Sequence, residues 1–323
     1  MNASTIEILS RYPRDITRLD ISGMDIRGTL DMFGFDRLEF LDCSVNRIDQ
    51  IIGLPSCLKN LVCFGNRIVI ASNLTLPDSL VKLNCSANLS LQNLPDLPPG
   101  LKKLDCSDCP LRKLNSLPEG LVELNCDGCG INQLDNLPGS LEVLSCGYNN
   151  LTSLDNLAEG LEILLCHGNL ITSLDSLPST LIKLDCNQCR ITHLDNLPAG
   201  LKILYCSHNF ITSLESLPSG LMRLIYDEST VEPMVNVPPG LFYTEDDVNP
   251  DANQDANQDA NPDADPDADP DANLDCYTCI QFGITPEQLD AENKARDERI
   301  IRWRSTHEVE RMDMILHMRS SRI

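Results

Sequence analysis

Aromatic residues are scarce in this chain of 323 residues, since Phe, Trp and Tyr together make up 4% of it. Leucine, by contrast, recurs at short intervals over residues 16–241. A single globular core usually buries several large aromatic side chains. The composition therefore predicts many small, similar layers rather than one large core.

Positive charge is also in short supply, with 25 Lys and Arg against 48 Asp and Glu and a formal net charge of -23. Nucleic acids and anionic membrane surfaces attract cationic proteins, so the composition argues against both as main partners. No apolar run approaches the ~18 residues of a membrane span. The first 15 residues lack the apolar stretch of a signal peptide. We therefore expect a cytoplasmic protein.

Cysteine, in contrast, is abundant. The chain has 15 Cys, an odd number that cannot all pair within one chain. Most of them recur at one fixed position of a repeat, which differs from a scattered disulfide framework and predicts a reducing compartment. Three Cys-x-x-Cys pairs, at 106–109, 126–129 and 186–189, raise the question of a zinc or redox site.

The second half of the chain repeats itself with an unbroken period of 20 residues. Each unit approximates L-x-x-L-x-C-x-x-N/C-x-L-x-x-L-x-x-L-P-x-G, and its positions are numbered here from the first Leu. Ten units are clear, and an eleventh decays. The units begin, at spacings of 20 to 22 residues, at Ile16, Leu38, Leu58, Leu80, Leu101, Leu121, Leu141, Leu161, Leu181, Leu201 and Leu221.

This pattern predicts an α/β repeat fold in the form of a solenoid. Positions 4 and 6 of each unit alternate as in a short strand with one face inward. Stacked units bring the strands into parallel register, so that they form a curved sheet lining a concave face. The return half of each unit bears Pro and is too short for a regular helix. It is expected to run along the convex side, extended or as a turn of 3-10 helix.

The spacing and the "LPxGLxxL" return resemble the leucine-rich repeat, in the short form of type-III-secreted bacterial effector proteins. They are also similar to repeat proteins of large DNA viruses of amoebae. The resemblance covers residues 16–243 and implies a host protein as the target and the host cytoplasm as the location. Some of these effectors carry a C-terminal ubiquitin-ligase domain of hundreds of residues. Fewer than 50 residues follow the acidic tract of this chain, so that activity is not carried over.

Four segments are expected. Residues 1–15 form an N-terminal cap, 16–243 a solenoid of about 11 units, 244–275 a disordered linker of Asp, Ala, Asn and Pro, and 276–323 a C-terminal helical segment. Twelve acidic residues and no Lys or Arg lie within 245–275, so this stretch is too charged and too polar to bury.

Each end of the repeat is expected to carry a helix. In the cap, Ser4 or Thr5 is the expected N-cap of a short helix whose Ile6, Ile8 and Leu9 face the first unit. Near the other end, a capping box predicts one or two helices that dock either on the solenoid or on a partner. Those two alternatives stay open.

The repeat explains the cysteine pairs by column. Position 6, an inward strand position, holds Cys43, Cys63, Cys85, Cys106, Cys126, Cys146, Cys166, Cys186 and Cys206. Position 9 holds Asn46, Asn66, Asn88, Asn149, Asn169 and Asn209, which we expect to form a ladder, and Cys109, Cys129 and Cys189 replace Asn there. Cys-x-x-Cys arises where both columns hold Cys, so a structural role is predicted, with no metal and no disulfides. Cys276 and Cys279 lie outside the repeat, and a metal or lipid role stays open for them.

Positions 3, 5, 7 and 8 project from the concave face, where variable residues can bind a partner. The early units offer polar residues there. The later units offer apolar and aromatic ones, interrupted by Lys183, Asp185 and Gln188. The predicted site consists of Val143, Tyr148, Ile163, Leu165, His167, Ile203, Tyr205, His208 and Ile225. Two other interpretations remain: these residues merely favour strands, or the C-terminal segment folds back over them.

No nucleophile with a base, phosphate loop or paired acid stands apart from the repeat columns. The sequence therefore predicts a non-enzymatic, monomeric scaffold without a cofactor or metal that binds a protein through its concave face. The alternative is a substrate-recognition adaptor of a ubiquitin-ligase complex, whose C-terminal helices would recruit the catalytic partner. A third hypothesis is a structural or dispensable member of an expanded repeat family.

Overall fold

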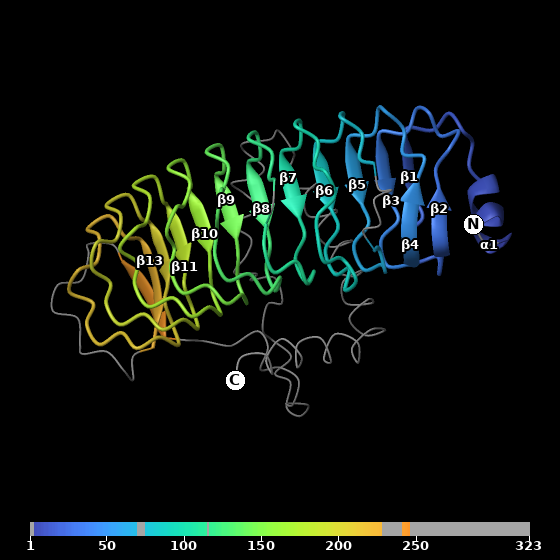
Figure 1. The fold of residues 1–323 in the computed structure, drawn as a ribbon. Coiled ribbons are helices and arrows are strands. Elements are labelled where there is room, and N and C mark those ends of the chain that lie inside the picture. The colour runs from blue at the N-terminus through green and yellow to red at the C-terminus, as the bar shows by residue number, and fades with distance from the viewer. Residues whose placement is uncertain (1–2, 70–74, 115, 228–240, 246–323) are drawn as a thin grey trace, which may run out of the picture. The chain divides into compact units, whose positions relative to one another are not determined.

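The computed structural model describes residues 3–69, 75–114, 116–227 and 241–245 (Figure 1). They all lie in the first of two compact units, Met1–Asp247. The second unit, Val248–Ile323, lies outside the described residues. So do the predicted linker beyond Glu245 and the predicted C-terminal helices, which stay predictions.

The first unit is a leucine-rich-repeat solenoid built on one parallel sheet (Figure 1). Neighbouring strands pair at equivalent repeat positions, as in Leu164 with Leu184 and Leu184 with Leu204. The 12 strands, in their order across the sheet, are β1 (Arg18–Asp20), β3 (Phe40–Asp42), β5 (Asn60–Val62), β6 (Lys82–Asn84), β7 (Lys103–Asp105), β8 (Glu123–Asn125), β9 (Val143–Ser145), β10 (Ile163–Leu165), β11 (Lys183–Asp185), β12 (Ile203–Tyr205), β13 (Arg223–Tyr226) and β14 (Phe242–Glu245).

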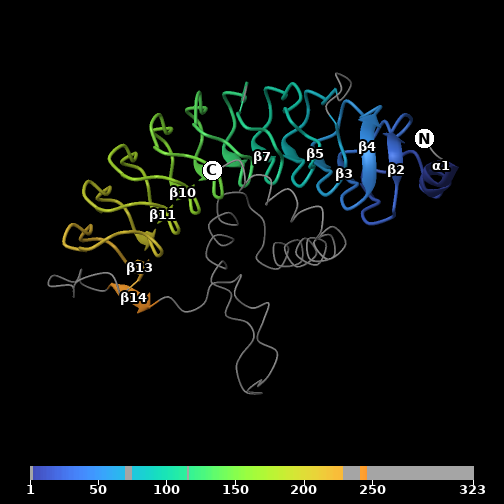
Figure 2. The same cartoon turned by 60° about the horizontal axis from the view of Figure 1, so that its bottom comes forward.

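Most of the strands place one Leu inward between two residues that project outward. In β7, for example, Leu104 is buried while Lys103 and Asp105 keep part of their surface. The strands line the inner side of the curved coils, and the return segments run along the outer side (Figure 2). The apolar columns of successive coils make one continuous core, which confirms the prediction of many small layers.

A turn at the "LPxG" stretch closes each coil. The carbonyl oxygen of Pro178 accepts a hydrogen bond from the backbone N–H of Leu181 at 3.2 Å, and the Pro of most other coils does the same. Proline has a fixed φ that favours the turn. It lacks a backbone N–H, but the turn uses only its carbonyl oxygen, so no hydrogen bond is lost. The return segment of these later coils contains turns and no regular helix, as predicted.

A second, two-stranded sheet covers the return side of the first two coils. It consists of β2 (Arg27–Asp31) and β4 (Arg47–Ile52), which run parallel with a bulge between Gly28 and Thr29. Ile48 and Ile51 of β4 are buried. The return of these coils is therefore extended, which is one of the two forms predicted from the sequence. The pairing between the two return strands was not predicted.

Helix α1 (Ala3–Ser10) caps the N-terminal end. The predicted N-caps are wrong, because Ser4 and Thr5 lie inside the helix. Thr5, Ile8 and Leu9 share the inward face, as predicted for the last two. The prediction for Ile6 is wrong: its side chain is 54% exposed, because one residue advances the helix by about 100° and turns Ile6 away from the face of Thr5. Among the described residues, no helix is long and apolar enough to span a membrane.

Candidate functional site

The cysteines of position 6 are packing residues. All nine are buried, and the 13 described cysteines are free thiols. Burial raises the pKa of the Cys63 thiol to about 12, and it is also the main reason why the pKa values of Cys146 and Cys166 are raised well above their usual range. A thiol that keeps its proton is a poor nucleophile. The predicted structural role of this column is confirmed.

The residues of position 9 form the predicted ladder. The Asn169 Nδ2 group donates to the carbonyl oxygens of Cys166 at 2.8 Å and of Cys146, one coil back, at 3.0 Å. Its Oδ1 atom accepts the backbone N–H of Leu151 at 3.0 Å. One side chain therefore satisfies backbone groups of two coils in the interior.

Where Cys replaces Asn, the thiol takes over part of this bonding. The Cys129 Sγ atom donates to the carbonyl oxygen of Cys106 at 3.2 Å, and Cys109 donates to that of Cys85 at 3.3 Å. Within the described ranges, no group of three or more His, Cys, Asp or Glu could hold a metal ion. Cys276 and Cys279 lie outside those ranges, and their role stays open.

The residues of the predicted partner site project from four coils, on β9, β10, β12 and β13 and the turns that follow these strands, and β11 lies between them. Tyr148 is the most prominent apolar side chain among them, with 48% of its surface exposed. Ile163 offers little surface, since it is 8% exposed. Most of the others keep intermediate exposure, namely Val143, Leu165, His167, Ile203, Tyr205 and Ile225, while His208 is exposed. Binding of a partner by these residues stays a prediction.

Two rings of adjacent coils interlock in this site. Tyr148 and His167 meet edge to face, with their ring centroids 4.8 Å apart and an interplanar angle of 87°. Gly147 and Gly168 make room for them, because a Cβ atom on Gly147 would lie 2.7 Å from His167 Nε2 and one on Gly168 would lie 2.7 Å from Tyr148 Cδ1. The two glycines therefore fix where the rings can lie.

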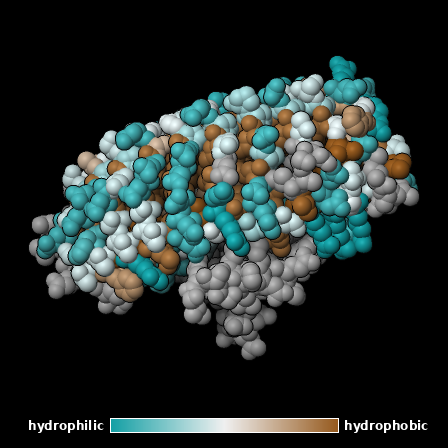
Figure 3. All heavy atoms as spheres, viewed as in Figure 1, coloured by the Kyte–Doolittle hydropathy of each residue, from teal (hydrophilic) through white to brown (hydrophobic). Residues whose placement is uncertain are grey.

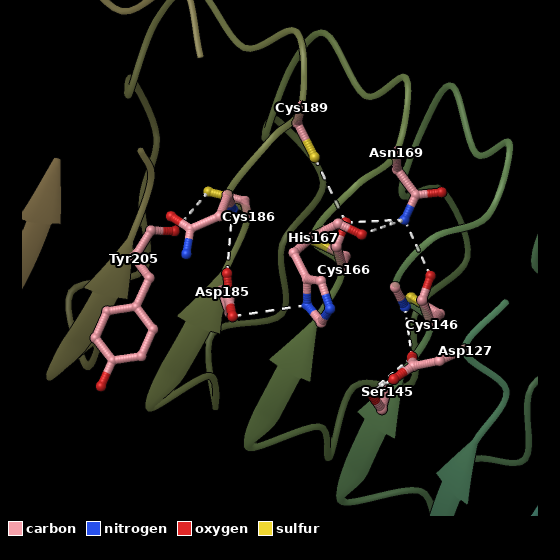
Figure 4. Close-up of polar contacts among 12 residues, drawn as sticks. Asp127, Ser145, Cys146, Cys166, His167, Asn169, Asp185, Cys186, Cys189 and Tyr205 are labelled. Carbon is pink, nitrogen blue, oxygen red and sulfur yellow. Dashed lines mark hydrogen bonds and ion pairs between the residues drawn. The ribbon is translucent and has the colours of Figure 1, made fainter. Parts of the chain in front are cut away.

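Carboxylates link these coils at the end of the strands (Figure 4). The Asp185 Oδ2 atom lies 3.6 Å from Nδ1 of His167. Asp127 accepts hydrogen bonds from the Ser145 hydroxyl at 2.8 Å and from the backbone N–H of Gly147 at 2.6 Å. His167 is thus held between Asp185 on one side and the turn at Gly147 on the other, which gives the site a defined shape.

Position 8 has a backbone conformation that was not predicted. Its φ is positive in each coil where the structure describes it, for example +50° at Tyr148, +67° at Gly168 and +55° at His208. Left-handed backbone is costly for residues other than glycine, so the coil geometry imposes it. The recurrence of Gly at this position, as in Gly128 and Gly168, is the signal in the sequence that could have revealed it.

Two cations beside Tyr205 were also missed as members of the site. The Lys183 Nζ atom lies 5.4 Å from the centroid of the Tyr205 ring, and the Arg223 Cζ atom lies 5.5 Å from it. Lys183 was interpreted as an interruption of the apolar surface. Lys183 and Arg223 occupy position 3 of coils that are two apart, with Ile203 between them. This shared repeat position is the feature of the sequence that could have linked the two residues.

Apolar surface is not confined to this site. The space-filling view shows hydrophobic residues between stripes of hydrophilic ones along the middle of the solenoid (Figure 3). The Leu residues of position 17, such as Leu137 and Leu177, are only partly buried. What distinguishes the predicted site is therefore the combination of apolar, aromatic and charged groups held in fixed positions, and not apolar exposure alone.

No model of a protein family matches this chain, and no curated protein matches it either. Solved structures do. "Novel Molecular Architecture of YopM-a Leucine-rich Effector Protein from Yersinia pestis" is 23% identical, with a TM-score of 0.57, and the match covers 70% of this chain and 75% of that one. InlJ from Listeria monocytogenes, whose structure "includes a cysteine ladder", is 25% identical with a TM-score of 0.54 over 67% of this chain and 54% of that one.

A YopM structure from Yersinia enterocolitica is 24% identical with a TM-score of 0.44, over 71% of this chain and 64% of that one. This chain thus spans less than two thirds of both this YopM structure and InlJ. The similarity to proteins of large DNA viruses stays a prediction. The matches with TM-scores above 0.5 include a leucine-rich bacterial effector, and they show that this chain has the leucine-rich-repeat fold.

Proposed function

We propose that this chain is a non-enzymatic scaffold that binds a protein partner through the concave face of its later coils. The observation that carries this proposal is a set of half-buried apolar and aromatic side chains on four strands, β9, β10, β12 and β13, with Lys183 and Asp185 of β11 between them. A rigid sheet presents such a set without losing backbone entropy on binding, so a few apolar anchors can supply most of the affinity.

The effector-like neighbours support this proposal at the level of the fold. If the resemblance to effectors extends to function, the partner is a host protein and the site of action is the host cytoplasm. The residues proposed as anchors are Val143, Tyr148, Leu165, His167, Ile203, Tyr205 and Ile225, with His208 at the exposed rim and Ile163 beneath them.

The test is a double variant, Val143→Lys with Leu165→Lys, compared with wild type in quantitative affinity capture from a eukaryotic lysate. Glu123 and Asp185 lie beside the two new Lys residues on neighbouring strands, so the substitutions remove apolar surface without placing like charges together. Circular dichroism verifies that the variant folds.

The matched control adds the same charge to the return side of the coils, with Thr152→Lys and Thr192→Lys at two exposed positions. The proposal expects a partner that wild type and the control capture and that the concave variant loses at least tenfold, as expected when about 1.4 kcal/mol or more of binding energy is removed. Equal capture by all three proteins would show that this face is not the binding surface.

A further inference from the structure

Tyr205 lies between two positive charges on the concave face. Across the sheet, Lys183 of β11, Ile203 of β12 and Arg223 of β13 are direct register partners. The Tyr205 ring comes within cation–π distance of both cations, at 5.4 Å from Lys183 and 5.5 Å from Arg223. Figure 4 shows this ring directed away from the pair formed by Asp185 and His167. The ring therefore holds two cations on a surface that also contains Ile203 and Ile225.

These cations belong to a row in which positive charge is concentrated. Position 3 of the first to eleventh coils carries five cations and a single carboxylate, although the whole chain has 25 Lys and Arg against 48 Asp and Glu. The cations are Arg18, Lys82, Lys103, Lys183 and Arg223, and the carboxylate is Glu123, which pairs with Lys103 at 2.6 Å. The charge of this row is thus opposite to that of the chain.

The carboxylates nearest in the sequence, Asp185 and Asp227, each contact a histidine. Asp185 accepts the backbone N–H of Asn187 at 3.1 Å and lies 3.6 Å from His167. Asp227 accepts the backbone N–H of His208, and its Oδ1 atom lies 3.7 Å from Nδ1 of His208. Both carboxylates thus bind backbone N–H groups of the turns that follow the strands.

The Arg223 side chain has an unused donor. Its Nε atom is buried and has no hydrogen-bond partner among the described residues. A buried guanidinium N–H without an acceptor costs free energy, which favours a movement of the side chain that brings this N–H to a ligand oxygen. The planar guanidinium is also suited to a carboxylate, which can accept two parallel hydrogen bonds from it.

We propose that Lys183, Tyr205 and Arg223 form a subsite for the carboxylate of an Asp or Glu side chain in an extended segment of the partner. This inference rests on the proposed function and specifies the chemistry of the partner. The apolar surroundings of Ile203 and Ile225 strengthen the attraction between the cations and a carboxylate, because they lower the local dielectric.

The geometry also sets a spacing in the partner. Leu165 and Tyr205 both occupy position 5, two strands apart. At about 4.8 Å per strand this separation is about 10 Å, which an extended peptide covers in about three residues. A partner segment that crosses the strands would therefore carry its acidic residue about three positions from an apolar residue that packs on Leu165.

The test uses the full chain as bait for a displayed library of random peptides of about 12 residues. The expected result is a set of peptides with Asp or Glu about three positions from an aliphatic or aromatic residue. For one synthetic peptide of this set, replacement of its acidic residue by the amide should weaken binding about 10- to 100-fold, as expected for charge-assisted hydrogen bonds. Arg223→Gln should weaken binding of the acidic peptide similarly and leave the amide peptide unchanged.

Arg18→Gln is the matched control. Arg18 is also at position 3 and lies 3.7 Å from the centroid of the Phe40 ring, so the control removes the same charge and a similar cation–aromatic contact far from the site. Selected peptides without acidic enrichment, or equal losses for Arg223→Gln and Arg18→Gln, would overturn the subsite and leave the proposed function standing. If wild type enriches no peptide over the Val143→Lys and Leu165→Lys variant, the proposed function fails and the subsite fails with it.

Discussion

Removal of one rung of the asparagine ladder should measure how much the ladder stabilises the solenoid. Asn169→Ala deletes the donor to the carbonyl oxygens of Cys146 and Cys166 and the acceptor of the Leu151 N–H. The Cys166 oxygen keeps a contact with the Cys189 thiol at 3.5 Å, and the Cys146 oxygen keeps the hydrogen bond from Asn149 Nδ2 at 3.0 Å, so the Leu151 N–H is the group left unsatisfied.

The magnitude follows from this one group. A buried polar group that loses its partner costs about 1–3 kcal/mol, so Asn169→Ala should lower the free energy of unfolding by about 2 kcal/mol. Asn169→Cys should cost about half as much, because Cys129 shows that a thiol at this position can still donate to a carbonyl of the preceding coil, and its sulfur is a weak acceptor. For a domain of this size, about 2 kcal/mol corresponds to a decrease in Tm of about 4–8 °C.

The assay is urea and thermal unfolding of the full chain followed by far-ultraviolet circular dichroism. Asn132→Ala, at an exposed position of the return segment, is the control and should change the free energy of unfolding by less than about 0.5 kcal/mol. The reasoning is refuted if Asn169→Ala behaves like this control, or if Asn169→Cys destabilises the chain as much as Asn169→Ala does.

Two further predictions concern the thiols and the glycines. Because 12 described cysteines are buried and burial raises the pKa of most of these thiols, at most three of the 15 thiols should react rapidly with Ellman's reagent at pH 8, and all 15 should react in urea. Rapid reaction of more than three would contradict this packing. Gly168→Ala should destabilise the chain more than Gly130→Ala does in urea unfolding, since both have positive φ but only Gly168 has Tyr148 within 2.7 Å of the new Cβ. Gly130→Ala should cost about 1–2 kcal/mol, and equal costs would show that the ring moves freely.

The repeat columns could be predicted because their physical role is the same in every coil. The period placed Cys166 inward and Asn169 at the turn, and both are buried there. The expected reason for Cys-x-x-Cys also holds, since Cys186 packs in the core and Cys189 replaces a ladder residue. A pattern that recurs ten times identifies the common environment even where a single coil is ambiguous.

The ends and the site were less predictable, because they depend on contacts between unlike residues. Ile6 is apolar but lies off the inward face of α1, so composition alone misplaced it. The contact of Tyr148 with His167 depends on glycines in alternating positions, "GY" in one coil and "HG" in the next. Such an arrangement becomes visible only when adjacent coils are compared position by position rather than summed into a consensus.

Hydrogen bonds at fixed repeat positions also arrange the charges of the concave face in a chain with a net charge of -23. The acidic residues of position 5 accept the backbone N–H of position 7, at 3.0 Å in Asp42 with Ser44 and 3.1 Å in Asp105 with Ser107. These bonds draw the carboxylates toward the end of the strands, where they stabilise the turn. The cations of position 3 remain at the opposite edge, so the concave face is polarised across its width. A bound segment would then be oriented by charge across the face while its apolar residues supply the affinity.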